Sequence, residues 1–160
     1  MATENIYEKL YRQIRIIFET DSRTNMIKIY GADNSKKSIM PCLLIFPDSK
    51  EYLEEGDDRP GRRIATPRKA MYRFNLFIYV NGTHIEDAYY NPVTTSNMGL
   101  TQAITEIEAV IKDNKTGTDP DDSTTRLWYD VVIENFKFDQ IPGKVLTAVA
   151  ELAFRRTETI

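Results

Sequence analysis

The sequence predicts an α+β fold: a mostly antiparallel mixed sheet of about five strands, two helices on one face, and a long projecting loop or hairpin arm. Three observations predict it. Two segments repeat apolar residues at helical spacing, five segments have the composition of strands, and a charged stretch interrupts them. A chain of 160 residues has the length of one ordinary domain, so we expect a single domain over 1–160.

Two amphipathic helices are expected. The first runs from about Thr3, taken as its N-cap, to Thr20, and the second follows a capping hydroxyl at 94–96 and ends near Asn114. Each has an apolar stripe at spacings of three and four, which predicts one buried face per helix. The stripes are Ile6, Leu10, Ile14, Ile17 and Phe18 in the first helix, and Leu100, Ala103, Ile104, Ile107 and Ile111 in the second.

The clearest strand runs from Met71 to Val80, because it is rich in β-branched and aromatic residues and contains neither Gly nor Pro. Side chains alternate between the two faces of a strand. One face is wholly apolar, with Tyr72, Phe74, Leu76, Ile78 and Val80. The other carries Met71, Arg73, Asn75, Phe77 and Tyr79. Apolar groups on both faces predict a central strand.

Four further strands complete the predicted sheet. A short strand at 26–30 and a buried one at 39–46 precede the central strand. Pro41 indicates that the second of these begins at, or lies along, an edge, because proline gives no ladder donor. Strands at 127–138 and 145–155 form a hairpin through a Pro-Gly turn near 140–143. The polar segment 115–125 before them is interpreted as a linker.

The segment 48–69 is the predicted arm. It has no sustained periodicity, and compact domains rarely carry so long a loop without a role. Its charges are sorted: the acidic Glu51, Glu54, Glu55, Asp57 and Asp58 precede the basic Arg59, Arg62, Arg63, Arg68 and Lys69. Three interpretations stay open: a solvated surface loop, charge pairing across a hairpin that turns near 58–61, or an arm that docks on the next subunit of a ring.

Composition narrows the classes of protein. The chain is 41% hydrophobic and 28% charged with a net charge of −3, which fits a globular protein and not a general nucleic-acid binder. The longest apolar run, 42–46, is too short to span a membrane. We expect no membrane partner and residence in a cytoplasm, because the N-terminus has no apolar signal core. One cysteine cannot form an internal disulfide.

No common catalytic motif is present, so we expect neither enzymatic activity nor a cofactor or metal. His84, the only histidine, lies near Glu86 and Asp87, but is interpreted as an exposed loop residue. The acidic run 119–122 is interpreted as a solvated loop and not a calcium site. Cys42 is interpreted as a buried apolar residue. A small enzyme or ligand-binding domain built on these residues is the least favoured alternative.

The second face of the central strand is the candidate functional surface. Two helices can cover only one face of the sheet, so we expect Arg73, Asn75, Phe77 and Tyr79 to have no partner within one subunit. Exposed apolar groups gathered on a sheet indicate a partner surface. We predict that these four residues and the sorted charges of the arm form contacts between subunits.

The layout as a whole resembles the tail-terminator proteins of long-tailed bacteriophages. The resemblance is carried by the opening helix from Ile6 to Tyr11, the strand at 40–46, the charged arm leading into 72–80, and a helix before the closing hairpin, which ends at 148–154. It covers about 150 residues at the level of pattern, since the family has no diagnostic short motif. The arm is longer and more charged than the family pattern suggests.

The resemblance implies a structural virion protein without catalytic activity. Such proteins form a hexameric ring that caps the tail tube, stops its growth and offers a surface to the head-tail connector protein. DNA would pass through the channel only as cargo. The implied location is the head-tail junction of the virion, after assembly in the host cytoplasm. The alternative is a head-completion or head-tail connector adaptor, which would lie against the portal instead of at the end of the tube.

Overall fold

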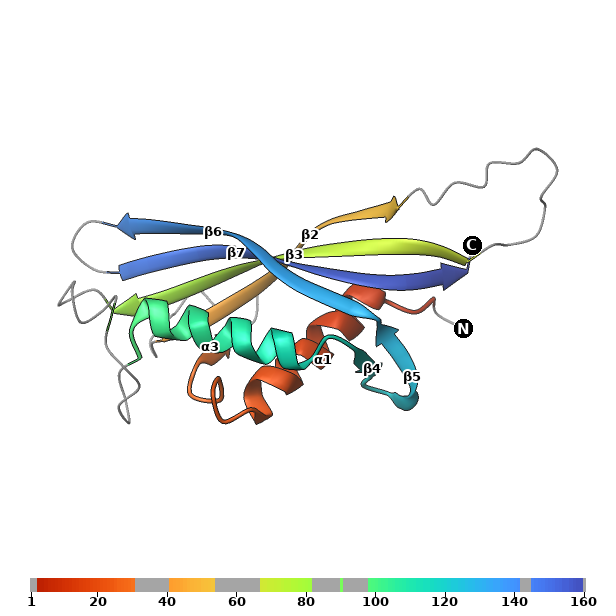
Figure 1. The fold of residues 1–160 in the computed structure, drawn as a ribbon, viewed down its shortest axis with the longest axis horizontal. Helices are drawn as coiled ribbons and strands as arrows, with labels where there is room; N and C mark the ends of the chain where they lie inside the picture. The colour runs from red at the N-terminus through yellow and green to blue at the C-terminus, as the bar shows by residue number, and fades with distance from the viewer. Residues whose placement is uncertain are drawn as a thin grey trace.

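A computed structural model describes residues 3–30, 41–53, 67–81, 90, 98–141 and 145–159, and its helices and strands form an α+β fold, as predicted (Figure 1). In chain order the elements are α1 (Ile6–Thr20), β1 (Lys28–Tyr30), β2 (Cys42–Leu53), β3 (Pro67–Asn81), α3 (Leu100–Asp113), β4 (Gly117–Asp119), β5 (Asp122–Trp128), β6 (Asp130–Ile141) and β7 (Val145–Thr159).

The main sheet has five strands in the order β1-β2-β3-β7-β6. β1 pairs with β2 in parallel, and the other three pairs are antiparallel, so the prediction of a mostly antiparallel mixed sheet is confirmed. β3 is the central strand, also as predicted. The two helices lie on one side of the sheet, and the small β4–β5 sheet lies on that side as well (Figure 1).

The core lies between the helices and the first face of the sheet. Alternate residues of β3 point into it, and Tyr72, Phe74 and Leu76 are at most 1% exposed. From β7, Phe154 packs edge-to-face on Phe74, with ring centroids 5.6 Å apart, and on Trp128 at 4.9 Å. The apolar stripes of α1 and α3 cover these rings, as the helical spacing predicts.

The helix termini differ in part from the prediction. Asn5, not Thr3, caps α1: its Oδ1 accepts a hydrogen bond from the backbone N–H of Glu8 at 3.1 Å. Asparagine does this as well as a hydroxyl residue, so the helix begins two residues later than predicted. α3 begins at Leu100, and its N-cap position, Gly99, makes no side-chain capping bond. The predicted caps at 94–96 lie outside the described residues.

The strands beside the arm are longer than predicted. β2 continues to Leu53, which pairs with Lys69 of β3, so both ends of the segment 48–69 belong to the sheet. Its polar outer half hid this strand from a search for apolar patterns, because the ladder with β3, and not burial, holds it in place. Paired strands therefore replace the expected loop at both ends of the segment. Residues 54–66 lie outside the described part of the chain.

Each of two strands carries one extra residue. In β2 the register shifts between Pro47 and Ser49, so Asp48 is inserted without a partner on β3. In β6 it shifts between Glu134 and Lys137, where Asn135 has a φ of 57°. Asparagine tolerates this left-handed conformation better than most residues do. The edge expected from Pro41 is wrong for the start of the strand, because β2 begins at Cys42 between β1 and β3. Only beyond Leu44, on the stretch that contains Pro47, does one side of β2 have no described partner strand.

The predicted linker at 115–125 is wrong, because it contains β4 and part of β5. Asp119 is held by the Lys9 ammonium group of α1, whose Nζ donates to Oδ2 at 2.6 Å, and Arg12 donates to Asp121 at 2.8 and 2.9 Å. Burial alone would raise the pKa of Asp119, but the Lys9 hydrogen bond outweighs it and lowers that pKa. Trp128 closes this unit, and its Nε1 donates to Asn114 O at 3.2 Å.

Candidate functional site

The candidate site is the face of the main sheet that points away from α1 and α3, which we call the second face. Among the described elements, no helix or strand lies over it (Figure 1). The β3 register places Arg73, Asn75, Phe77 and Tyr79 on this face, and all four are half-buried. The structure therefore brings these four predicted residues together in a row.

The centre of the second face is a charged cluster around Arg73. Its Nη2 donates to Glu51 Oε1 at 2.7 Å, and its Nη1 lies 3.6 Å from Glu134 Oε1 and 3.9 Å from Glu151 Oε2. The hydrogen bond to Glu51, followed by the fields of the other two carboxylates, raises the pKa of Arg73. One cation facing three carboxylates leaves this centre with an excess of negative charge.

One end of the second face is aromatic and apolar. Cys42 and Leu44 of β2 are buried, and Phe46, Phe77 and Tyr79 pack against them. The rings of Phe46 and Phe77 meet edge-to-face with centroids 5.7 Å apart. Cys42 is buried among apolar neighbours, as the sequence indicated. This end of the face is therefore a second, smaller apolar cluster outside the main core.

The prediction that the second-face residues have no partner within one subunit is wrong. Arg73 has its three carboxylates, Phe77 has Phe46, and Asn75 donates to Asp48 Oδ1 at 3.3 Å. The contact with Asp48 depends on the extra residue in β2, which alternation along the strand does not predict. Whether these side chains also contact a second subunit stays a prediction.

Of the ten charged arm residues, the structure describes three. Glu51 binds Arg73, and Arg68 is exposed at the start of β3. Lys69 is half-buried, and its Nζ lies over the ring of Tyr129, 6.0 Å from the centroid. The other seven arm residues lie outside the described part of the chain: Glu54, Glu55, Asp57, Asp58, Arg59, Arg62 and Arg63.

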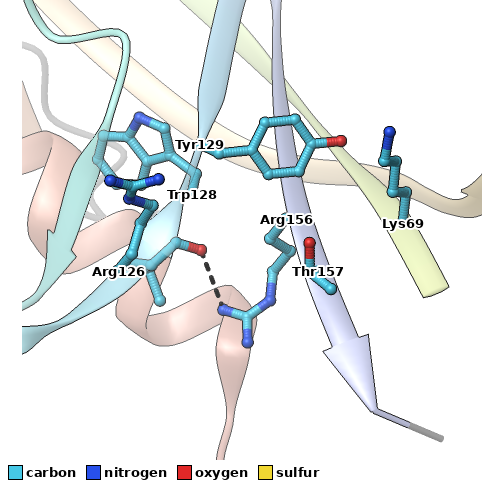
Figure 2. A pocket seen from close by; sticks show the side chains of 7 residues that line it. Lys69, Arg126, Trp128, Tyr129, Arg156 and Thr157 are labelled. Atoms are coloured by element: carbon cyan, nitrogen blue, oxygen red, sulfur yellow. Dashed lines mark hydrogen bonds between the residues drawn. The ribbon is translucent and has the colours of Figure 1, made fainter. Parts of the chain in front are cut away.

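Lys69 belongs to a basic pocket that the sequence analysis missed (Figure 2). The pocket has a volume of about 420 Å³ and lies where β5 passes into β6, beside the ends of β3 and β7. Three cationic side chains line it, with two aromatic side chains and two hydroxyl groups. Its residues are Lys69, Arg126, Leu127, Trp128, Tyr129, Arg156 and Thr157. These residues come from distant parts of the chain, so no short motif could have indicated the pocket.

Next to the pocket, on the core side of the same strand ends, Glu158 collects three polar neighbours. Lys50 lies 3.0 Å from its carboxylate, Arg156 Nε lies 3.2 Å from it, and the Tyr72 hydroxyl donates to it. Burial, followed by this hydrogen bond, raises the pKa of Tyr72 to about 12. Burial alone would raise the pKa of Glu158, but the hydrogen bonds from Tyr72 and Lys50 lower it instead.

The acidic run 119–122 is the turn between β4 and β5, and the interpretation as a solvated loop is wrong only for Asp119, which is buried, while Asp121 and Asp122 are exposed. Lys9 and Arg12 hold the first two carboxylates, and Asp122 accepts hydrogen bonds from Thr124 and Thr125. Within the described ranges, no group of three His, Cys, Asp or Glu side chains could hold a metal ion. His84, Glu86 and Asp87 fall outside those ranges. No helix among the described residues is long and apolar enough to cross a membrane.

Comparison with known proteins adds no relative. No protein-family model matches the sequence, and no curated protein is significantly similar to it. The functional interpretation therefore depends on the surface itself.

Proposed function

We propose that this chain is a ring-forming tail terminator of a long-tailed bacteriophage, which acts by shape and contact, without catalysis. Copies of the chain would associate in a closed ring, hexameric by the family resemblance, at the end of the tail tube. The ring would stop tube growth, contact the tail tube protein on one side and the head-tail connector protein on the other, and let DNA pass. Its location would be the head-tail junction of the virion.

The observation that carries this proposal is the composition of the second face. Arginine and aromatic residues are enriched where proteins bind one another, and the row of Arg73, Phe77 and Tyr79, next to Phe46, has this composition. The helices that cover the first face lie away from it (Figure 1). A face with an apolar end and an acidic centre gives a partner both contact area and a fixed orientation.

The test is the size of the purified protein, measured by light scattering over a range of concentrations. We expect a discrete oligomer for the wild type. Phe77→Glu should reduce assembly, because it buries a carboxylate in the apolar end of the face. Ile16→Glu is the matched control, since Ile16 is a large apolar residue, 45% exposed, on α1 on the opposite side of the sheet.

A wild-type protein that stays monomeric at all concentrations and never binds tail tubes would contradict the proposal. If both variants lose assembly equally, the result would contradict the assignment of the subunit contacts to the second face. Imaging of virions with a labelled protein then separates the two assembly roles. A signal at the tube end supports the terminator, and a signal against the portal supports the connector adaptor.

A further inference from the structure

We propose that the basic pocket lined by β3, the end of β5, Tyr129 and β7 binds the acidic segment 54–58 of a second copy of the chain (Figure 2). This inference rests on the self-association proposed above and names one of its contacts. The segment reads Glu-Glu-Gly-Asp-Asp, so it offers four carboxylates within five residues.

The positive charge of the pocket favours the binding of an anionic group. Arg126 is exposed and has no acidic partner within the described part of the chain. Arg156 donates from Nη1 to Leu127 O at 3.2 Å, and Glu158 lies 3.2 Å from its Nε, which leaves Nη2 without such a contact among the described residues. Guanidinium groups bind carboxylates through paired, charge-assisted hydrogen bonds, so two of them in one pocket fit an acidic side chain.

The main chain beside the pocket favours an extended polypeptide. β6 begins at Asp130, opposite Arg155, and no described strand continues the ladder on that side of β7. Tyr129 N donates to Arg155 O, so the carbonyl of Arg155 points to the β6 side, and that of Thr157, two residues on, does so too. A peptide can add to such a strand end through its own backbone while its acidic side chains reach the arginines.

A nucleic acid fits the surroundings less well. The chain carries a net charge of −3, and the second face nearby has three carboxylates against Arg73. A long polyanion would be repelled by this field, whereas a short acidic segment brings only four carboxylates to the three cations of the pocket. The basic residues of the pocket are also too few to follow a phosphate backbone.

The self-association proposed above favours a second copy over the same chain as the source of the segment. The segment follows directly after Leu53 of β2, which pairs with Lys69 of the pocket, while Arg126 and Arg156 lie at β5 and β7. The oligomer size of the Arg126→Glu variant, described below, tests the second copy against the same chain.

The test uses a fluorescent peptide of residues 52–58 and the full chain with Glu54, Glu55, Asp57 and Asp58 changed to Gln or Asn, so that its own segment does not compete. Fluorescence anisotropy should show binding that weakens with added salt. Arg126→Glu should weaken it about tenfold or more, because a charged hydrogen bond is lost and a repulsion added. Lys28→Glu, an exposed site on β1 at the other edge of the sheet, is the matched control.

Failure to bind, or binding that Arg126→Glu leaves unchanged, overturns the inference. Binding of a Gln/Asn version of the peptide with equal strength overturns it as well, because charge would then play no part. A labelled single-stranded oligonucleotide that binds in place of the peptide, and is lost with Arg126→Glu, assigns the pocket to phosphate instead.

The oligomer size of Arg126→Glu in the otherwise wild-type chain keeps this inference separate from the proposed function. A smaller oligomer supports the pocket as a subunit contact. If the variant forms a full-size oligomer but does not bind the peptide, the pocket is not a subunit contact, and the proposed ring is unaffected. A wild type that stays monomeric overturns the ring, and with it the second copy as the occupant of the pocket.

Discussion

Phe74 and Phe77 allow the two faces of β3 to be compared with one chemical change, substitution by alanine. Phe74 is 1% exposed and packs against Phe154 in the core, so Phe74→Ala should cost about 3–5 kcal/mol of unfolding free energy. Phe77 is half-buried beside Phe46 on the second face. Its loss removes about half of a full phenylalanine burial, or about 0.8–1.5 kcal/mol.

Urea unfolding followed by circular dichroism measures both values. With a slope of about 2 kcal/mol per M, Phe74→Ala should lower the urea midpoint by about 2 M and Phe77→Ala by less than 1 M. The midpoints should be measured at a protein concentration low enough to keep the chain unassociated, because assembly stabilises the folded state. Equal shifts, or a larger shift for Phe77→Ala, would refute the assignment of the two faces.

Three further predictions concern other contacts. Gly117→Ala should lower the unfolding free energy by about 1–3 kcal/mol in calorimetry, because a Cβ there would collide with the buried ring of Trp128; Thr118→Ala, at an exposed site, is its control. Arg73→Gln should destabilise by about 1 kcal/mol at neutral pH, since three carboxylates then repel one another, and 0.5 M salt should restore part of the loss; no salt effect would contradict this. Glu158 has a lowered pKa, so its contribution to the unfolding free energy is present above the ordinary carboxyl pKa and is lost as the pH falls through the pKa of the folded state. Glu158→Gln should therefore be less stable than wild type at pH 7 and approach wild-type stability in acid. A constant difference in unfolding free energy, measured by urea titration at several pH values, would argue against this.

The main sheet could be predicted because its information is local. Alternation along 71–80 indicated the central strand and its buried face, and every residue of that face is at most 6% exposed. The helices could be predicted for the same reason, since their stripes repeat within a few turns. Where a segment is stabilised by burial of its own apolar side chains, the spacing of those side chains in the sequence indicates whether it is a helix or a strand.

The β4–β5 unit could not be predicted, because its stabilising contacts come from elsewhere in the chain. Its carboxylates are neutralised by Lys9 and Arg12, which precede them by more than a hundred residues. The same holds for the outer half of β2, which is held by its ladder with β3, and for the basic pocket, which forms where β3, β5, β6 and β7 meet. Sorted charges indicated a docking role for the arm, but not the pocket that we propose as its receptor.

The extra residues in β2 and β6 have a consequence for how copies can meet. Both strands have a long side without a described neighbour, and a straight, regular strand there would be a template for stacking chain upon chain without limit. Asp48 after Pro47, and Asn135 in its left-handed conformation, break the spacing of donors and acceptors partway along each side. An added strand would lose its register after a few residues. Copies are thereby steered away from fibre-like growth along β2 and β6 and toward contacts elsewhere, which can close on themselves and stop.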